Sequence, residues 1–226
     1  MILAIDTSTA MISVALYDGS TILGEFTWKS PNRHSTVLAP AVGSLFRKTG
    51  VHFSDLSALA VALGPGSFTS LRIGLAFAKG INAALNIPIV GVPTLSYFAA
   101  SQQTSRATIC AVLTAGREKY ATQFFENKAN GCAAISEIDV HTIESLSAVI
   151  VAPTVITGEV TGEMRTALRR SQNRNIRFSS PGFELRRAGF LAVQAWKLFR
   201  KGAYESGDGL TPIYLHTNGP AIRAGA

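Results

Sequence analysis

The chain has 226 residues, of which 47% are hydrophobic and 15% are charged, and its formal net charge is +7. This composition excludes a disordered chain, because so many apolar residues can bury a sizeable core, and the length suits one large domain or two small ones. The apolar runs are too short for a membrane span, and residues 1–6 lack the basic start of a signal peptide. We therefore expect a cytoplasmic protein.

Metal and redox chemistry leave no signal in the sequence. Cys110 and Cys132 are the two cysteines, so the chain has no C-x-x-C pair, and its four histidines stand far apart. Zinc sites usually need closely spaced cysteine or histidine ligands. We expect no metal site.

The first lobe begins with strands and continues with alternating helices and strands. Residues 2–6, 12–17 and 21–27 predict three strands, with a turn at Asp18-Gly19 before the third. A helix begins at Asn32 or Ser35 and ends near Lys48, where Gly50 follows in the position of a left-handed cap. Short strands at residues 58–63 and 87–92 and a helix over 94–102 continue the pattern, which is typical of a covered α/β sheet.

A glycine loop joins the strand at residues 58–63 to a long helix over residues 68–85. The strand is continuously apolar, as expected for a strand covered on both faces. Gly64 and Gly66 allow positive φ angles and a close backbone approach, and Ser67 or Thr69 is placed to cap the helix. The loop therefore predicts bare N–H groups at a helix N-terminus.

The helix over residues 68–85 is apolar on two sides. One line consists of Leu71, Leu75, Ala78 and Leu85, and the other of Ile73, Phe77, Ile81 and Ala84. Arg72 lies in the first turn, where the helix dipole disfavours a cation. An anion or an acidic partner would explain this position, and so would an arginine that extends into water.

The second half repeats the strand order of the first. Polar residues 101–106 interrupt the pattern, so we place an N-terminal lobe at residues 1–105 and a C-terminal lobe at 106–226. The expected elements after the boundary are strands at 108–114, 120–126 and 132–140 and helices at 162–170 and 182–202. Two lobes that both start with strand, turn, strand, strand indicate a duplicated α/β lobe.

Positive charge is concentrated near the C-terminus. Residues 165–201 hold ten basic residues and the single acid Glu184, whereas the rest of the chain is slightly acidic. This segment either contacts nucleic acid or forms the solvated side of two helices. Its aromatic residues fall largely at helical spacing, which favours a place in the core.

Three motifs carry a resemblance to a known family. Residues 1–9 (MILAIDTST), Arg33-His34-Ser35 and residues 64–74 (GPGSFTSLRIG) closely resemble the bacterial TsaB (YeaZ) family. Residues 78–80, 87–92 and 212–215 look like the same family. The resemblance covers the N-terminal lobe almost completely and the C-terminal lobe in patches. It implies an α/β protein of the two-lobed actin-like ATPase and sugar-kinase (ASKHA) superfold, with duplicated ribonuclease-H-like lobes.

The resemblance also implies a function in tRNA modification. TsaB is the non-catalytic partner of TsaD, a paralogue that transfers a threonylcarbamoyl group to the adenosine 3′ of the anticodon in tRNAs reading codons that begin with A. The implied partners are TsaD in a heterodimer, the TsaE ATPase, tRNA through the complex, and a second copy of the chain when TsaD is absent.

Residue types at the expected active positions indicate that the chain is not an enzyme. Ser8 stands where an ATPase of this superfold needs glycine, and the turn at Thr114 lacks a carboxylate. The turn at residues 156–159 has one glycine where an adenosine-binding turn usually has two. By the resemblance, Thr94 and Phe98 take the places of the two histidines that bind metal in TsaD, and neither can replace an imidazole.

Two sets of residues are candidate binding sites. The first is a degenerate phosphate site with at most weak nucleotide binding, made of Asp6, Thr7, Gly64, Gly66 and Ser67. The second is a docking face for TsaD on two helices, made of Leu71, Arg72, Gly74, Leu75, Phe77 and Ala78, with Leu38 and Leu45 from the helix before.

Two other classes of function remain open. A small nucleotide-dependent kinase or ATPase would use Asp6, Thr7 and the glycine loop to hold phosphate, although no Walker G-x-x-x-x-G-K pattern is present. A hydrolase is less consistent with the sequence, because Ser67 lacks the G-x-S-x-G elbow and fits a helix cap better. Nucleotide binding would discriminate the kinase from the partner protein.

Overall fold

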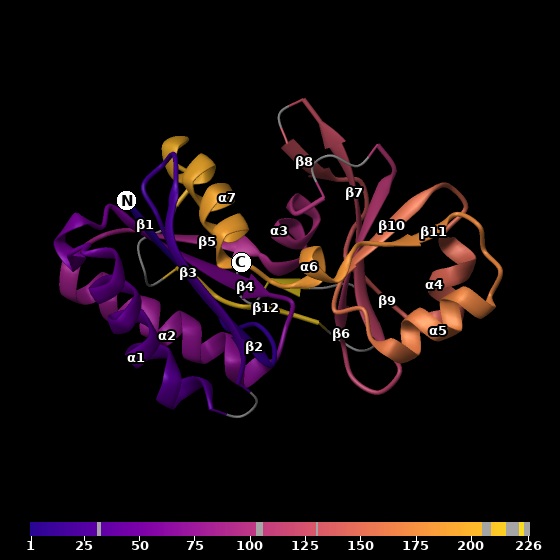
Figure 1. Cartoon of the computed structure of the whole chain (residues 1–226), viewed down its shortest axis with the longest axis horizontal. Coiled ribbons are helices and arrows are strands. Elements are labelled where there is room, and N and C mark those ends of the chain that lie inside the picture. The colour runs from indigo at the N-terminus through magenta and orange to yellow at the C-terminus, as the bar shows by residue number, and fades with distance from the viewer. Residues whose placement is uncertain (31–32, 103–105, 130, 205–208, 216–221, 224–226) are drawn as a thin grey trace. The chain divides into compact units, whose positions relative to one another are not determined.

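The computed structural model describes residues 1–30, 33–102, 106–129, 131–204, 209–215 and 222–223 (Figure 1). The strands are β1 (Ile2–Asp6), β2 (Met11–Tyr17), β3 (Ile22–Lys29), β4 (Ala58–Gly64), β5 (Ile89–Pro93), β6 (Thr108–Thr114), β7 (Tyr120–Lys128), β8 (Gly131–Ala134), β9 (Asp139–His141), β10 (Thr154–Gly158), β11 (Ile176–Phe178), β12 (Ile213–Tyr214) and β13 (Ile222–Arg223). The helices are α1 (His34–Thr49), α2 (Phe68–Leu85), α3 (Thr94–Ala100), α4 (Ile143–Val149), α5 (Gly162–Arg170), α6 (Pro181–Glu184) and α7 (Ala188–Arg200), with a short 3-10 turn at Phe53–Asp55. Among the described helices, none has the length and apolar character needed to cross a membrane.

The chain divides into two compact units. The first unit contains Met1–Thr94, Arg186–Ile213 and Arg223–Ala226, and the second contains Leu95–Leu185 and Tyr214–Ile222. This division differs from the boundary expected at residue 105, because α3 begins the second unit and α7 returns to the first. Helix α7 belongs to the first unit because it packs against β1 and β2. Sequence order alone did not indicate that return.

The first unit is a five-stranded mixed sheet covered by helices on both faces. Its strand order is β3-β2-β1-β4-β5, in which β1, β2 and β3 are antiparallel neighbours and β4 and β5 run parallel to β1. Helices α1 and α2 cover one face and α7 covers the other (Figure 1). Both β1 and β4 are buried along their whole length, as the unbroken apolar runs in their sequences predict.

The second unit repeats this topology. Its sheet has the order β11-β10-β6-β7-β8, so that β6, β7 and β8 correspond to β1, β2 and β3, and β10 and β11 correspond to β4 and β5. Strand β9 pairs with β7 outside this path. Helices α4 and α5 lie together beside β10 and β11, over a core that includes Leu146, Ile156 and Leu168. The duplicated α/β lobe expected from the sequence is confirmed by the strand order.

Two expected elements are each divided in the structure. The strand expected over residues 132–140 is two short strands, β8 and β9, separated by a bend. The helix expected over residues 182–202 is α6 and α7, because the backbone at Leu185 and Arg187 is extended. The other helices and strands for which limits were predicted begin and end within a few residues of those limits. Asn32, one of the two expected starts of α1, lies outside the described residues, and α1 begins at His34.

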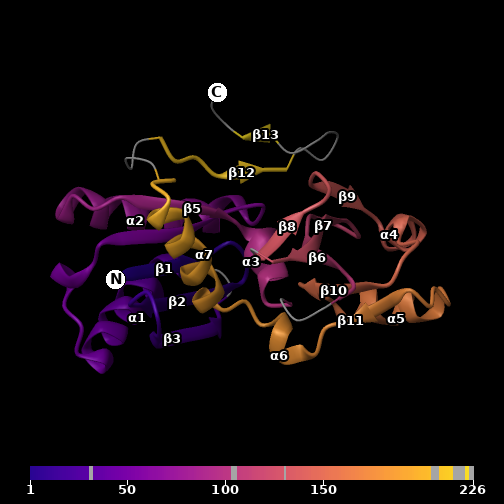
Figure 2. The same cartoon turned by 90° about the horizontal axis from the view of Figure 1, so that it is seen from above.

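The described chain ends with a small two-stranded sheet. Strands β12 and β13 pair with each other, as the view in Figure 2 shows. Leu210 and Ile213, just before and at the start of β12, are buried. Leu210 and Ile213 therefore contribute apolar side chains to the core of the first unit.

Candidate functional site

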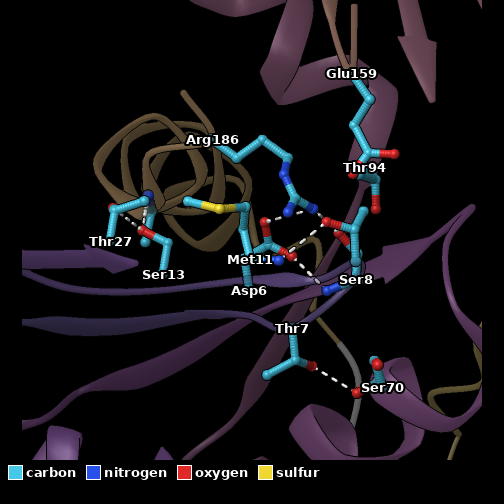
Figure 3. A network of polar contacts seen from close by, with 12 residues as sticks. Asp6, Thr7, Ser8, Met11, Ser13, Thr27, Ser70, Thr94, Glu159 and Arg186 are labelled. Carbon is cyan, nitrogen blue, oxygen red and sulfur yellow. Dashed lines mark hydrogen bonds and ion pairs between the residues drawn. The ribbon is translucent and has the colours of Figure 1, made fainter. Parts of the chain in front are cut away.

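The turn after β1 brings together the residues expected to hold phosphate. Asp6 ends the central strand, and its carboxylate accepts a hydrogen bond from the Ser8 N–H at 2.7 Å. Thr7 points to the other side, where its hydroxyl donates to the Ser70 carbonyl at 2.7 Å (Figure 3). All three turn residues, Asp6, Thr7 and Ser8, are almost completely buried. The turn is held by its own side chains and backbone.

The glycine loop packs directly on this turn. The Ser67 N–H donates to the Ser8 carbonyl at 2.7 Å, and a Cβ on Gly66 would collide with the same oxygen. Gly64 has a positive φ of +107°, as expected, whereas Gly66 is needed for the close approach and not for its φ. Ser67 stands at the N-cap of α2 without a side-chain capping bond, contrary to its expected role. The expected bare N–H group of Ser67 is therefore used within the protein.

Helix α2 touches the same turn through a second glycine. Thr7 Oγ1 occupies the space where a Cβ on Gly74 would lie. Gly74 thus allows α2 to approach the end of β1 closely, and the Thr7 hydroxyl satisfies the Ser70 carbonyl in the first turns of that helix. Gly74 was expected on the docking face, but in the structure it is buried against Thr7.

Arg186 brings a positive charge to the carboxylate of Asp6. Its Nη1 lies 3.9 Å from Asp6 Oδ2 and donates to the Ser8 hydroxyl at 3.2 Å (Figure 3). The side chains of Arg186 and Asp6 are 2% and 1% exposed. Buried ions are stable only when they are paired and hydrogen-bonded. This internal guanidinium therefore supplies a buried counter-charge for Asp6.

The start of α7 positions Arg186. The Ala188 N–H donates to the Ser13 hydroxyl on β2 at 2.8 Å, and the Arg187 guanidinium pairs with Glu25 on β3 at 2.9 Å. Because the residues after Arg186 are fixed on two strands, its side chain reaches the β1–β2 turn. In the sequence, Arg186 is one of the ten basic residues at 165–201, and the residues next to it in the chain do not distinguish it from the other nine.

The polar groups expected to hold phosphate at this turn make contacts within the first unit. Phosphate-binding turns present backbone N–H groups to the ligand, usually at glycines. Here the Ser67 N–H is bonded to Ser8, Ser8 adds a side chain, and Arg186 is packed against Asp6. A nucleotide phosphate would have to displace these contacts before it could reach the turn.

The corresponding turn of the second unit contains a carboxylate from another segment. Glu159 follows β10 and accepts hydrogen bonds from the Thr114 N–H at 3.1 Å and from its hydroxyl at 2.5 Å. The Thr114 turn has no carboxylate in its own sequence, but the Glu159 carboxylate, 45 residues further along the chain, is bonded to it. The Gly158 before it has a φ of +109° and lies against the Val112 carbonyl, so the backbone geometry accounts for this glycine.

Thr94 and Phe98, which by the resemblance take the places of two metal-binding histidines, make structural contacts. Thr94 is fully buried, and its hydroxyl accepts the Gly64 N–H at 3.1 Å in the first unit. Phe98, in the second unit, packs edge-on against Tyr97. Within the described ranges, no group of three or more histidine, cysteine or acidic side chains could hold a metal ion.

Burial raises the pKa of the Cys110 thiol, and it raises the pKa of Cys132 to about 11.

The residues expected to dock a partner divide between the core and the surface. Leu71, Gly74, Leu75 and Ala78 of α2 and Leu38 and Leu45 of α1 are buried in the first unit. Arg72 is exposed over the Phe68 ring, at 3.8 Å from its centroid, and Phe77 is half-buried. The outer side of α2 instead carries Phe68, Ala76, Gly80 and Ala83, so the helix remains a candidate with different residues.

The basic segment at residues 165–201 is divided between the two units. Arg186 is buried and Arg187 is paired with Glu25, both in the first unit. Arg165 pairs with Glu184 in the second unit and stacks 4.6 Å from the centre of the Phe178 ring. Each unit also carries four exposed cations of this segment, which are Arg187, Lys197, Arg200 and Lys201 in the first and Arg169, Arg170, Arg174 and Arg177 in the second.

The sequence of this chain matches a family model and several curated proteins. A family model described as "TsaD: tRNA N6-adenosine threonylcarbamoyltransferase" matches residues 29–153. The "tRNA threonylcarbamoyladenosine biosynthesis protein TsaB" of Escherichia coli (strain K12) is 40% identical over 94 residues, which are 42% of this chain and 40% of that protein. TsaB of Bacillus subtilis (strain 168) is 36% identical over 127 residues, which are 56% of each chain. The matches thus span about half the length of these curated relatives.

Solved structures show the same fold over nearly the whole chain. YeaZ from Pseudomonas aeruginosa is 24% identical, has a TM-score of 0.80, and is matched over 95% of this chain and 99% of its own. The ROK hexokinase from Thermus thermophilus is 12% identical, with a TM-score of 0.50 and coverage of 85% and 96%. The fold is therefore that of the actin-like ATPase and sugar-kinase superfold.

The sequence matches show to which family within this fold class the chain belongs. The family model covers more than half of the chain, and the curated relatives with names in tRNA modification are TsaB proteins. The chain belongs to the TsaD-related family of tRNA threonylcarbamoyladenosine proteins and, within it, to the TsaB (YeaZ) family.

Proposed function

We propose that this chain is the non-catalytic partner of a TsaD transferase in the formation of threonylcarbamoyladenosine in tRNA. The modified base is the adenosine 3′ of the anticodon in tRNAs that read codons beginning with A. The names of the E. coli and B. subtilis relatives support a role in this biosynthesis. TsaD and the TsaE ATPase are the protein partners, and tRNA is bound through the assembled complex.

The buried contact between Arg186 and Asp6 is the observation that supports a non-catalytic role. An ATPase of this superfold needs an accessible phosphate turn and a carboxylate that can hold metal and orient water. In this chain Asp6 is paired with Arg186, Ser8 is packed against the glycine loop, and Glu159 is bonded to Thr114. The side chains that remain at these turns support the structure of each unit and offer no group for phosphate or acyl transfer.

The outer side of α2, together with α1, is the proposed docking surface for TsaD. Ala76, Gly80 and Ala83 are exposed along α2, and Ala39 is exposed on α1. Small side chains let a partner helix approach closely, and Phe68 and Phe77 add apolar area beside them. We expect the same surface to pair two copies of this chain when TsaD is absent.

Reconstitution tests the function directly. TsaD and TsaE from the same genome are combined with tRNA, with and without this chain, and the modified nucleoside is measured. The expected result is modification only when the chain is present. The chain alone should show neither ATP hydrolysis nor threonylcarbamoyl transfer. ATP turnover by the isolated wild-type chain would contradict the proposal and favour the kinase or ATPase alternative.

A further inference from the structure

Exposed basic residues that are distant in the sequence lie together at one edge of the second sheet, namely the edge formed by the strand ends where its parallel strands begin. Parallel strands β6, β10 and β11 all begin at this edge, and antiparallel β7 ends there. Arg106 lies two residues before β6, Arg174 two residues before β11, and Lys128 ends β7. Arg170 ends α5, which returns the chain from the end of β10 to the start of β11. We call Arg106, Lys128, Arg170 and Arg174 the basic edge.

The acidic residues of the second unit lie mainly at the opposite edge. Acidic residues of this opposite edge follow β6 or β10, begin β9, or lie in the first turns of α4 and α5, and Arg117 and Lys119 lie among them. They are Glu118, Asp139, Glu144, Glu159 and Glu163. Among the described residues, Glu126 on β7 is the acid at the basic edge, and the neighbouring residues 103–105 and 130 are uncharged in the sequence. The strands thus separate the charges of the unit into a basic edge and a mainly acidic one.

The basic edge belongs to a well-connected part of the second unit. Asn173, which precedes Arg174, donates from Nδ2 to the carbonyls of Ser147 and Ile150 at 2.9 and 2.8 Å. The Thr154 N–H on β10 donates to the Asn175 carbonyl at 2.8 Å. These bonds join the end of α4 to the loop between α5 and β11. The backbone that carries Arg170 and Arg174 is therefore fixed before any ligand binds.

The four cations of the basic edge are exposed, and within the described ranges none of them forms an ion pair. The neighbouring Arg165, by contrast, pairs with Glu184. The strand order β11-β10-β6-β7 places three strand spacings between Arg174 and Lys128, which is about 14 Å at 4.7–4.9 Å per strand. This width is sufficient to follow several phosphates of one nucleic-acid backbone.

We propose that the basic edge binds the phosphate backbone of the tRNA substrate. This inference rests on the proposed function, which supplies an RNA ligand, and it assigns that ligand to the second unit. Arginine and lysine groups on a fixed backbone are the usual contacts to phosphate, and they position the nucleic acid without reading its bases. Three of the four groups are guanidinium groups, which bind phosphate through paired N–H donors.

A charge-matched pair of variants tests the proposal. In the first variant Arg106, Lys128, Arg170 and Arg174 are all replaced by alanine, and in the control Lys29, Lys197, Arg200 and Lys201 are replaced, which are exposed cations of the first unit. Each variant is assembled with TsaD and TsaE, and binding of a substrate tRNA and of a tRNA from outside the substrate class is measured across salt concentrations. Circular dichroism and thermal melting check the fold.

The expected result is a loss of roughly tenfold or more in affinity for both tRNAs with the basic-edge variant alone. The slope of log K against log salt should become shallower by up to about 3, because each lost phosphate contact removes about 0.7–0.9. Equal effects of the two variants, or no effect of the first, would overturn the proposal. So would loss of protein assembly with an unchanged salt slope, since the edge would then bind a protein.

The proposed function can fail separately. If wild-type chain were dispensable for tRNA modification, the function would be wrong, whereas the binding comparison would still report on the basic edge. An exposed valine gives an internal check: Val151 lies at the same edge and is 82% exposed. Val151→Ser should leave the salt slope unchanged, and a loss of protein assembly in that variant alone would indicate that Val151 contacts a partner protein.

Discussion

Arg186 and Asp6 form an ion pair between positions 180 residues apart in the chain, with Nη1 and Oδ2 separated by 3.9 Å. Both residues are buried, and Ser8 bonds to each of them through its backbone N–H and its hydroxyl. The chain thus carries its own cation at the turn after β1.

Removing the carboxylate should destabilise the first unit strongly. Asp6→Ala leaves the buried Arg186 guanidinium without its carboxylate, which costs about 3–5 kcal/mol when a buried ion pair is broken in this way. Asp6→Ala combined with Arg186→Met should recover part of that loss, because no buried charge remains. Urea unfolding followed by circular dichroism measures both variants.

The matched control for this pair is Arg187→Ala. Arg187 pairs with Glu25, but its side chain is 52% exposed, so its loss should cost about 1 kcal/mol or less. If Asp6→Ala and Arg187→Ala lowered the free energy of unfolding equally, the burial of the Asp6–Arg186 pair would have no energetic consequence. The buried pair would then no longer support a non-catalytic role.

Two glycine substitutions should have opposite effects on stability. In Gly66→Ala the added Cβ meets the Ser8 carbonyl, so the loop must move, at a cost of about 1–3 kcal/mol. In Gly80→Ala the Cβ points into open space within α2, and alanine should stabilise the helix by about 0.5–1 kcal/mol. Thermal unfolding of the isolated chain gives both signs. A stabilised Gly66→Ala would show that the loop does not pack on the turn.

A large charged residue on the outer side of α2 should prevent assembly with TsaD. Ala76 is exposed on that side, so Ala76→Arg should fold normally and yet fail to co-purify with TsaD. Ala148→Arg introduces the same group at an exposed position of α4 in the second unit and should assemble like wild type. Normal binding by a folded Ala76→Arg would move the docking surface away from α2.

The buried Cys110 thiol and the half-buried Cys132 thiol should make stability fall at alkaline pH. Burial raises the pKa of Cys132 to about 11 from its ordinary value of 9.0. Between these values the unfolded thiol loses its proton while the folded thiol keeps it, so the unfolded state binds fewer protons and stability decreases as pH rises. Cys132→Ala should therefore show a smaller decrease between pH 9 and 11 in urea titrations. An identical decrease in both proteins would show that the thiol does not contribute.

Much of the fold follows from local patterns in the sequence. Residues 2–5, 58–63 and 109–113 are short and continuously apolar, and all three belong to interior strands. Gly50 ends α1 with a φ of +70°, as expected of a left-handed cap. These features depend on side-chain polarity and backbone preference over a few neighbouring residues, so they are visible without a tertiary structure. The duplicated strand order is visible for the same reason.

The tertiary structure alone decided which residues face inward and which meet across the chain. Helical periodicity showed two apolar sides on α2, but only packing on β4 revealed that Leu71 and Leu75 face the core. Arg186 has the same local sequence signal as Arg170, yet one is buried beside Asp6 and the other is exposed at the end of α5. Charge and polarity are properties of single residues, whereas burial and pairing depend on contacts between distant segments, which no local pattern contains.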